Sequence, residues 1–159
     1  MVEIFELTKR EIKEIEEIIR KNYGANFKFK DIVFKTSKDK IWILSRMFKN
    51  IDISRVVINS AGLYFGRLKR NKKIKLSIEG AQLIGENATK NIVEVDEEEA
   101  KRFIQGLNIK RFKKVNAELN NFVLVKYKKD ILGVGILRET HVENLLPKSR
   151  RIYLDIKKD

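Results

Sequence analysis

The 159-residue sequence has no cysteine and only one histidine, one proline and one tryptophan. Without cysteine it cannot form disulfides, iron–sulfur clusters, thiolate zinc sites or a thiolate nucleophile. Because His141 is the one histidine, a metal site with two histidines is excluded. A catalytic triad of Ser, His and Asp would have to use this single histidine as its base. We therefore expect a protein that binds rather than catalyses, and we expect no cofactor.

Long apolar runs are also missing. No segment is apolar over the length needed to cross a bilayer, and the first residues mix charged with apolar side chains, unlike a secretion signal. We expect a cytoplasmic protein that makes no membrane contact.

Basic residues, in contrast, are abundant, with 35 Lys and Arg against 22 Asp and Glu and a formal net charge of +13. The stretch over 61–75, AGLYFGRLKRNKKIK, carries no acidic residue and six basic ones: Arg67, Lys69, Arg70, Lys72, Lys73 and Lys75. Such a patch makes a polyanion, RNA or DNA, the first partner to consider. The alternative is a solvated hairpin in a lysine-rich protein.

The first half of the chain combines helix and strand patterns. Thr8 and Glu11 form a capping-box pattern, and isoleucines at helical spacing follow until Gly24, which predicts a helix over about 8–22. Alternating apolar residues predict strands over 27–34, 40–44, 55–59, 63–68 and 74–76, and a short helix is predicted over 77–87. This half is expected to be an α+β unit.

The second half begins near Asn91 with a short β-branched run. Asp96 and Glu99 mark a helix start and Gly106 its end. Strands are predicted over 109–115, 122–127, 131–137 and 151–156. One short helix among strands favours a small, closed or partly closed β-barrel. We place the boundary between the halves so that one domain spans 1–89 and the other 90–159.

Two further basic groups lie in this half. One surrounds Phe112 in the segment GLNIKRFKKVN, which begins at Gly106 and contains Lys110, Arg111, Lys113 and Lys114. The glycine allows a backbone to approach a phosphate, and Phe112 either stacks on a base or packs in the core. The other group follows Pro147 and comprises Lys148, Arg150 and Arg151.

Four segments together resemble the C-terminal RNA-binding domain of the Fmu/Sun RNA cytosine-C5 methyltransferases: GLYFGRLKRNKKIKLSIEGAQLIG, DEEEAKRFIQG, FVLVKYKKDILGVGIL and NLLPKSRRI. The residues that match this pattern are Gly62, Gly66, Gly106, Leu132, Gly133, Gly135, Asn144, Pro147 and Lys148. The second half is similar to the PUA domain, and the whole layout resembles the two-domain Nip-type ribosome-biogenesis factors. The resemblance implies an α+β fold, with an N-terminal α/β pre-PUA-like unit followed by a PUA-like β-pseudobarrel.

The sequence departs from the methyltransferases because it has neither a cysteine nucleophile nor a cofactor-binding glycine loop, and it has Pro147, Lys148 and Ser149 in place of the usual P-K-G. The resemblance therefore implies a free-standing, non-catalytic protein that binds structured rRNA or tRNA and assists RNA modification or ribosome biogenesis. An RNA methyltransferase or another ribosome-assembly factor is the candidate protein partner. The predicted RNA contacts are Arg67, Lys69, Arg70, Lys72, Lys73, Gly106, Lys110, Arg111, Lys113, Lys148, Arg150 and Arg151.

Two other hypotheses stay open at this point. The protein is alternatively a protein–protein adaptor of the ribosome-assembly or RNA-methylation machinery. The second hypothesis is an enzyme with an unfamiliar site between the two halves, which would use Asp52, Glu79 or His141.

Overall fold

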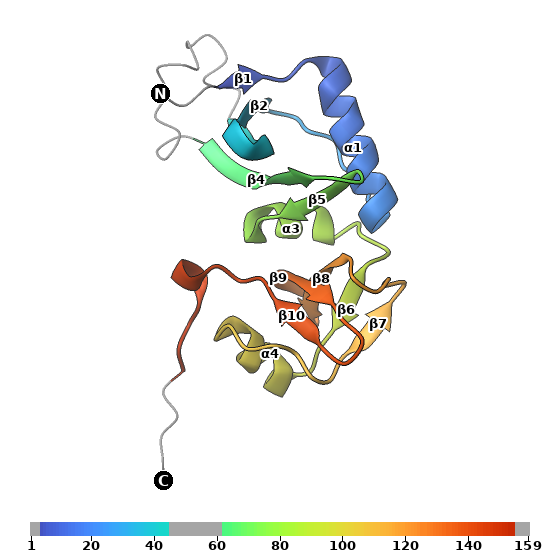
Figure 1. Cartoon of the computed structure of the whole chain (residues 1–159), viewed down its shortest axis with the longest axis vertical. Helices are drawn as coiled ribbons and strands as arrows, with labels where there is room; N and C mark the ends of the chain where they lie inside the picture. Colours follow the sequence, from blue (N-terminus) through green and yellow to red (C-terminus); the bar gives the residue numbers. More distant parts are fainter. Residues whose placement is uncertain (1–3, 45–61, 155–159) are drawn as a thin grey trace.

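The computed structural model describes residues 4–44 and 62–154. Each half of the chain forms one five-stranded sheet with helices packed around it, so the fold is α+β, as predicted (Figure 1). The strand predicted over 55–59 and the candidate residue Asp52 lie outside the described residues. None of the helices within the described ranges is long and apolar enough to span a membrane.

Helix α1 (Lys9–Tyr23) begins and ends where its local signals predict. The hydroxyl of Thr8 accepts from the backbone N–H of Glu11 at 3.2 Å, and the Glu11 carboxylate accepts from the backbone N–H of Thr8 at 3.0 Å. These two bonds satisfy donors that have no partner inside the helix. Gly24 ends the helix with φ 68°, in the left-handed region that glycine adopts readily.

The first sheet has the antiparallel order β1-β2-β3-β4-β5. Its strands span Phe5–Glu6, Ile32–Thr36, Lys40–Leu44, Gly62–Lys69 and Lys73–Leu76, with a 3-10 turn η1 at Ser37–Asp39. Ile41, Phe65 and Ile74 are fully buried in one apolar cluster with residues of α1. Strand β2 starts later than predicted because Phe27 and Phe29 pack against the Phe65 ring instead of pairing with a neighbouring strand. Their ring centroids lie 5.6 and 5.0 Å from that of Phe65.

The second sheet has the order β10-β9-β8-β6-β7, with β6 and β8 parallel. Its strands are β6 (Ile92–Glu94), β7 (Lys113–Val115), β8 (Phe122–Tyr127), β9 (Asp130–Leu137) and β10 (Val142–Asn144). The same half contains the helix α4 (Glu97–Ile104) and the 3-10 turn η4 (Lys148–Arg150). The segment 109–115 reaches both edges, because Ile109 bridges Val142 of β10 while β7 pairs with β6. This segment closes the sheet into a partly closed barrel, as predicted.

The strand predicted over 151–156 is wrong over its described residues, 151–154, which pair with no strand. The apolar alternation that suggested it belongs to an exposed segment, in which Tyr153 is 72% exposed. The backbone N–H of Ile152 donates to the carbonyl of Ile104 at 2.8 Å. One edge of the second sheet, that of β10, is bridged by Ile109.

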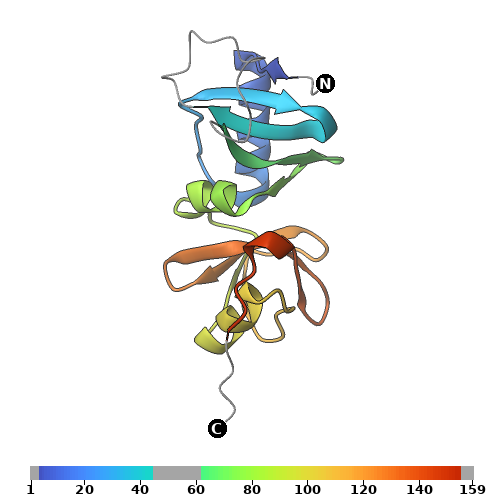
Figure 2. The same cartoon turned by 90° about the vertical axis from the view of Figure 1, so that its left-hand side faces the viewer.

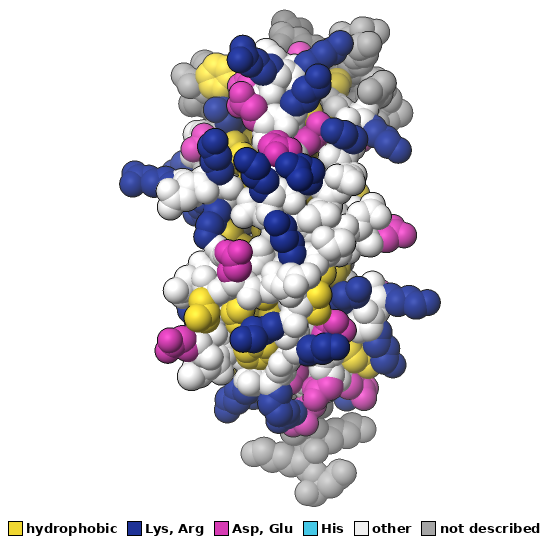
Figure 3. Space-filling view, turned by 90° about the vertical axis from the view of Figure 1, so that its right-hand side faces the viewer, with side chains coloured by type: hydrophobic (Ala, Val, Ile, Leu, Met, Phe, Trp, Pro, Cys, Tyr) yellow, Lys and Arg dark blue, Asp and Glu magenta, His cyan; other side chains and the backbone are white. Residues whose placement is uncertain are grey.

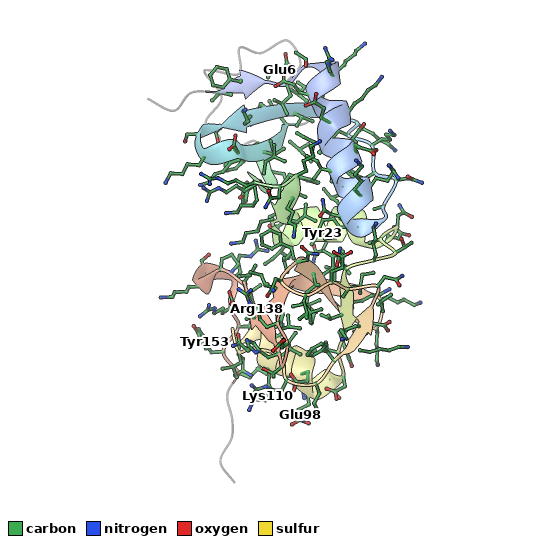
Figure 4. All side chains as sticks on the ribbon, turned by 45° about the vertical axis from the view of Figure 1, so that its right-hand side comes forward. Glu6, Tyr23, Glu98, Lys110, Arg138 and Tyr153 are labelled. Carbon is green, nitrogen blue, oxygen red and sulfur yellow. The ribbon has the colours of Figure 1, made fainter. Side chains whose placement is uncertain are left out.

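One apolar cluster is shared by the two sheets, and the second sheet has a further apolar cluster of its own. Helix α3 (Ile78–Gly85) lies between them, and Ile84 packs in the same cluster as Ile131 of β9 and Leu124 of β8. Polar contacts add to this core, since the Gln82 amide donates to the Ile131 carbonyl at 3.2 Å. Tyr23, whose carbonyl accepts from the N–H groups of residues 89 and 90, lies at this junction (Figure 4). The predicted domain boundary falls in the connection between α3 and β6 and stays a prediction.

Candidate nucleic-acid interface

The basic stretch over 61–75 forms the hairpin of β4 and β5. Lys69 and Lys73 lie opposite each other at its end, and the turn between them places Asn71 and Lys72 at φ 64° and 54°. Asparagine tolerates this conformation better than most residues. The side-chain amide of Asn22 at the end of α1 donates to the Lys72 carbonyl at 2.9 Å and fixes the turn against the helix.

The register of the sheet brings basic side chains together across three strands. Lys40 of β3 lies opposite Arg67 of β4, which lies opposite Lys75 of β5. Residues opposite each other on antiparallel strands share one face and lie within direct reach of one another. The pKa of Lys75 is lowered by its partial burial and by the positive charges of Lys69 and Arg67. The sheet therefore carries a row of like charges on the face away from α1.

These charges have little local compensation. Among the described residues, no carboxylate oxygen lies within 4.0 Å of a charged nitrogen of Lys40, Arg67, Lys69, Arg70, Lys72, Lys73 or Lys75. On the face that carries α1, by contrast, basic and acidic side chains are interspersed (Figure 3). A concentration of one sign of charge raises the local concentration of ligands of the opposite sign.

An aromatic row runs beside the basic one. Phe34, Trp42 and Tyr64 lie on neighbouring strands, with ring centroids 6.4 Å and 5.1 Å apart. Phe34 is buried, whereas Trp42 and Tyr64 are half-buried. Neither Trp42 nor Tyr64 is among the RNA contacts predicted from the sequence. The signal that was available is the alternation in β3, which puts Trp42 on the same face as Lys40.

The group around Phe112 is arranged differently. Arg111 forms ion pairs with Glu98 at 3.0 Å and with Asp96 at 3.7 Å, and Glu98 is the main cause of the raised pKa of Arg111. Phe112 is half-buried against the apolar cluster of the second sheet, which favours its core interpretation. Figure 4 shows Lys110 and Glu98 at the end of the molecule away from the first sheet. The positive charge of Arg111 is thus already shared with carboxylates.

The third basic group, at 148–151, is held by contacts within the protein. One guanidinium nitrogen of Arg150 donates to both carboxylate oxygens of Glu79, at 2.7 and 3.0 Å. The Arg151 side chain donates to the Leu146 carbonyl at 3.3 Å. It also packs against Gly106, because a Cβ added to this glycine would stand 2.5 Å from the Arg151 Cδ. Gly106, with φ 96°, is therefore explained by its backbone conformation and by the packing of Arg151.

Asn144 organises the loops around this group. Its amide donates to the carbonyls of Phe103 and Leu107 at 2.8 and 2.7 Å, and its oxygen accepts from the N–H of Leu146 at 2.7 Å. These bonds join the end of α4 to the segment that leads into η4. Asn144, which matches the pattern of the Fmu/Sun C-terminal domain, thus has a structural role.

Two of the predicted basic groups meet in one cleft of about 280 Å³ between the halves. One wall belongs to the first sheet and the other to the segment 145–150, and Figure 2 shows η4 below the strands on the side away from α1. The cleft is lined by Lys40, Tyr64, Arg67, Lys75, Leu76, Ser77, Ile78, Glu79, Val134, Leu145, Leu146, Pro147 and Arg150. Lys110 and Arg111 instead line a separate, shallower hollow together with Arg138.

The structure gives little support to an enzyme site. Glu79 lines the cleft, but its carboxylate is bound by Arg150, and His141 does not line the cleft. The Nδ1 atom of His141 lies 3.1 Å from the hydroxyl of its neighbour Thr140. Within residues 4–44 and 62–154, no group of three or more His, Asp and Glu side chains could hold a metal ion.

Comparisons with known proteins agree with this fold. Residues 90–152 match the family model of the PUA domain of the methyltransferase RsmF. Among solved structures, a PUA domain from Aeropyrum pernix K1 in complex with tartrate is similar over 93% of this chain and 87% of its own, at 14% identity and a TM-score of 0.57. A conserved PUA domain protein from Thermoplasma acidophilum is similar over 91% of this chain and 93% of its own, at 16% identity and a TM-score of 0.56. No curated protein matches the sequence. The predicted PUA-like fold and the resemblance to the Fmu/Sun C-terminal domain are confirmed.

Proposed function

Because the second half of this chain is a PUA domain related to the C-terminal domain of the Fmu/Sun methyltransferases, and PUA domains generally bind RNA, we propose that the protein binds structured RNA, ribosomal or transfer. It does so without catalysing a reaction. It assists the modification of that RNA or the assembly of ribosomes, beside an RNA methyltransferase or another assembly factor that acts on the same RNA.

The observation that carries this proposal is the uncompensated charge of the β4–β5 hairpin and the adjoining sheet face. Like charges directly opposite each other, as at Lys69 and Lys73, destabilise a sheet. A polyanion that binds there offsets this repulsion and releases its own counterions, which favours binding. Arg67 and Lys75 of this hairpin line the cleft, so one RNA can contact both.

Structured RNA suits this surface better than DNA. A-form RNA is recognised by its shape, its phosphates and its 2′-hydroxyls, and unpaired nucleotides at loops and bulges offer further contacts. The surface combines cations for phosphates with the half-buried rings of Trp42 and Tyr64. Two separate hollows, the cleft and one beside Arg138, favour a folded rather than a uniform partner.

The proposal is tested first by removing two charges from the hairpin. The variant K69Q/K73Q should bind a folded tRNA about tenfold more weakly than the wild type. The slope of log affinity against log salt should become shallower by about 1.5, since each phosphate contact contributes about 0.7–0.9. Both quantities come from a fluorescence anisotropy titration at several salt concentrations. The melting temperature should not fall, because the opposed charges are relieved.

The matched control is K9Q/R10Q, which removes the same charge from the exposed start of α1, at the opposite end of this helix from the Asn22 contact with the hairpin turn. This control should keep the affinity and the salt slope of the wild type within a factor of two to three. Equal losses in the two double variants would mean that only net charge matters. Equal affinity of the wild type for the tRNA and for DNA of matching sequence, falling together as salt rises, would contradict recognition of structured RNA.

A further inference from the structure

We propose that the cleft between the first sheet and the segment 145–150 holds one unpaired nucleotide of the bound RNA, with its phosphate on the row Lys40, Arg67 and Lys75 and its base against Tyr64. This inference deepens the proposed function and rests on it. It assigns the ligand to a site and states which part of the RNA enters it.

The basic row is the first support. Three cations from three neighbouring strands stand side by side in the cleft wall. Partial burial and nearby positive charge lower the pKa of Lys75, which shows that the positive charges of the row repel one another when no anion is bound. An anion placed among these side chains relieves the crowding and accepts several charge-assisted hydrogen bonds.

Arg67 is oriented for such a contact. Its Nε donates to the backbone carbonyl of Lys38 at 2.9 Å, which fixes the plane of the guanidinium. A guanidinium has five N–H donors, and no acceptor in residues 4–44 or 62–154 is bonded to the four on its terminal nitrogens, which can therefore bind a phosphate. A donor group that is already fixed loses less entropy when the ligand binds.

Glu79 does not neutralise this row. Its carboxylate is bound at both oxygens by Arg150 on the opposite wall, at 2.7 and 3.0 Å. Four basic side chains and one acidic side chain line the cleft, and the acidic one is paired. The cleft therefore keeps a net positive charge opposite its own apolar wall.

Tyr64 and the second wall suit the remainder of a nucleotide. Tyr64 lines the cleft and is half-buried, and burial raises the pKa of its hydroxyl, which therefore stays protonated and can donate a hydrogen bond. Leu145, Leu146 and Pro147 supply apolar surface across from it. A base has a flat face for such surface and a phosphate for the cations, whereas an inorganic anion uses the cations alone.

The size of the cleft excludes a duplex. At about 280 Å³ it lies near the lower limit of ligand pockets, about 300 Å³, so it admits one nucleotide turned out of a helix rather than a base pair. Unpaired and bulged nucleotides are the parts of RNA that can turn out in this way at low cost. The protein should therefore prefer RNA that offers such a nucleotide.

The test compares two RNA duplexes that differ only in one bulged uridine. The wild type should bind the bulged duplex about tenfold more tightly, as expected when one base gains an aromatic contact. The variant K75Q should lose most of this preference. The matched control K73Q removes the same charge from the same strand and the same face, two residues away, but outside the cleft. It should weaken binding to both duplexes equally and keep the preference.

A second variant, Y64L, removes the aromatic ring and leaves the charge unchanged. It should reduce the preference for the bulged duplex without changing the salt dependence of binding. Equal preference in K75Q and K73Q, or no preference in the wild type, would overturn the nucleotide site while RNA binding itself stands. Failure of the wild type to bind either duplex or a folded tRNA would instead overturn the proposed function.

Discussion

At the scale of single residues, the surroundings of a basic side chain decide whether its charge is available. Arg111 and Lys69 both come from basic runs in the sequence. Arg111 is paired with Asp96 and Glu98, whereas Lys69 has no described carboxylate within 4.0 Å and faces Lys73. A surface ion pair contributes little to stability, but it must be broken or shared before a phosphate can take its place. We therefore give the hairpin the larger part of the RNA contact.

Tyr23 provides a test at this scale. Its hydroxyl donates to the Ile74 carbonyl at 2.9 Å, and complete burial raises its pKa well above the ordinary value of 10.0. The folded state thus favours the protonated phenol. The resulting stabilisation is fully present below about pH 10 and decreases as the pH rises above that value toward the raised pKa.

The substitution Tyr23→Phe should lower the free energy of unfolding by about 1 kcal/mol at pH 7, because the Ile74 carbonyl loses its partner. The difference from the wild type should narrow above pH 10. Urea unfolding between pH 7 and pH 11 measures both effects. Tyr153→Phe, at a site that is 72% exposed, is the control and should change neither. A constant difference between Tyr23→Phe and the wild type at all pH values would contradict the assignment.

At the scale of elements, close packing of α3 on β4 sets the shape of the cleft wall. Ser77 caps α3, and its hydroxyl donates to the Tyr64 carbonyl at 2.7 Å while it accepts from the N–H of Gly80 at 2.9 Å. Gly80 then passes so close to β4 that a Cβ on it would stand 2.1 Å from the carbonyl oxygen of Phe65. Backbone atoms on a buried strand cannot move aside cheaply, so glycine is required here.

The substitution Gly80→Ala should therefore destabilise the protein, although helix propensity alone predicts that it stabilises. Alanine in place of glycine inside a helix ordinarily stabilises by about 1 kcal/mol. Here the clash should lower the free energy of unfolding by about 2 kcal/mol or more. Leu83→Ala, in the same helix at a side chain that is 46% exposed, should cost less than about 1 kcal/mol. Chemical denaturation measures both variants, and a Gly80→Ala protein as stable as the wild type would disprove the close approach.

At the scale of the whole molecule, the apolar cluster that both sheets share is expected to make the two halves one folding unit. Ile131 of the second sheet packs in the apolar cluster that also contains Ile19, Ile41 and Phe65 of the first half. Elements that share a core of this kind are expected to unfold together. The same contacts fix the two walls of the cleft relative to each other.

Ile131→Ala tests this cooperativity with a reporter in the other half. The substitution should cost about 2–3 kcal/mol, because it removes most of a nearly buried side chain. The one tryptophan, Trp42, lies in the first sheet, so its fluorescence reports the half that is not mutated. The unfolding midpoint measured by Trp42 fluorescence should shift as far as the midpoint measured by circular dichroism. An unchanged Trp42 transition beside a shifted dichroism transition would mean that the halves unfold independently.

Local patterns predicted much of this fold. The capping box of Thr8 and Glu11, the cap at Asp96 and the alternation in β3 and β8 depend on residues a few positions apart. Such signals can be recognised within a short stretch of sequence, and these elements agree with their predicted bounds within one or two residues. Strands β2 and β7, in contrast, begin several residues later than predicted. The prediction over 151–156 failed because alternation does not show whether an edge is free to pair.

The sequence by itself determined the α+β class, the main helices and strands, the basic hairpin and the resemblance to PUA domains, because each depends on composition, short-range spacing or motif order. Only the tertiary structure decided which cations are paired and which face a cleft. Arg150 meets Glu79 across 71 positions of the chain, and Arg67 comes to the same cleft from strand β4 of the first sheet. Distances of this kind depend on how the two halves pack, since Coulomb energy and hydrogen bonding act over a few ångströms in space and not along the chain.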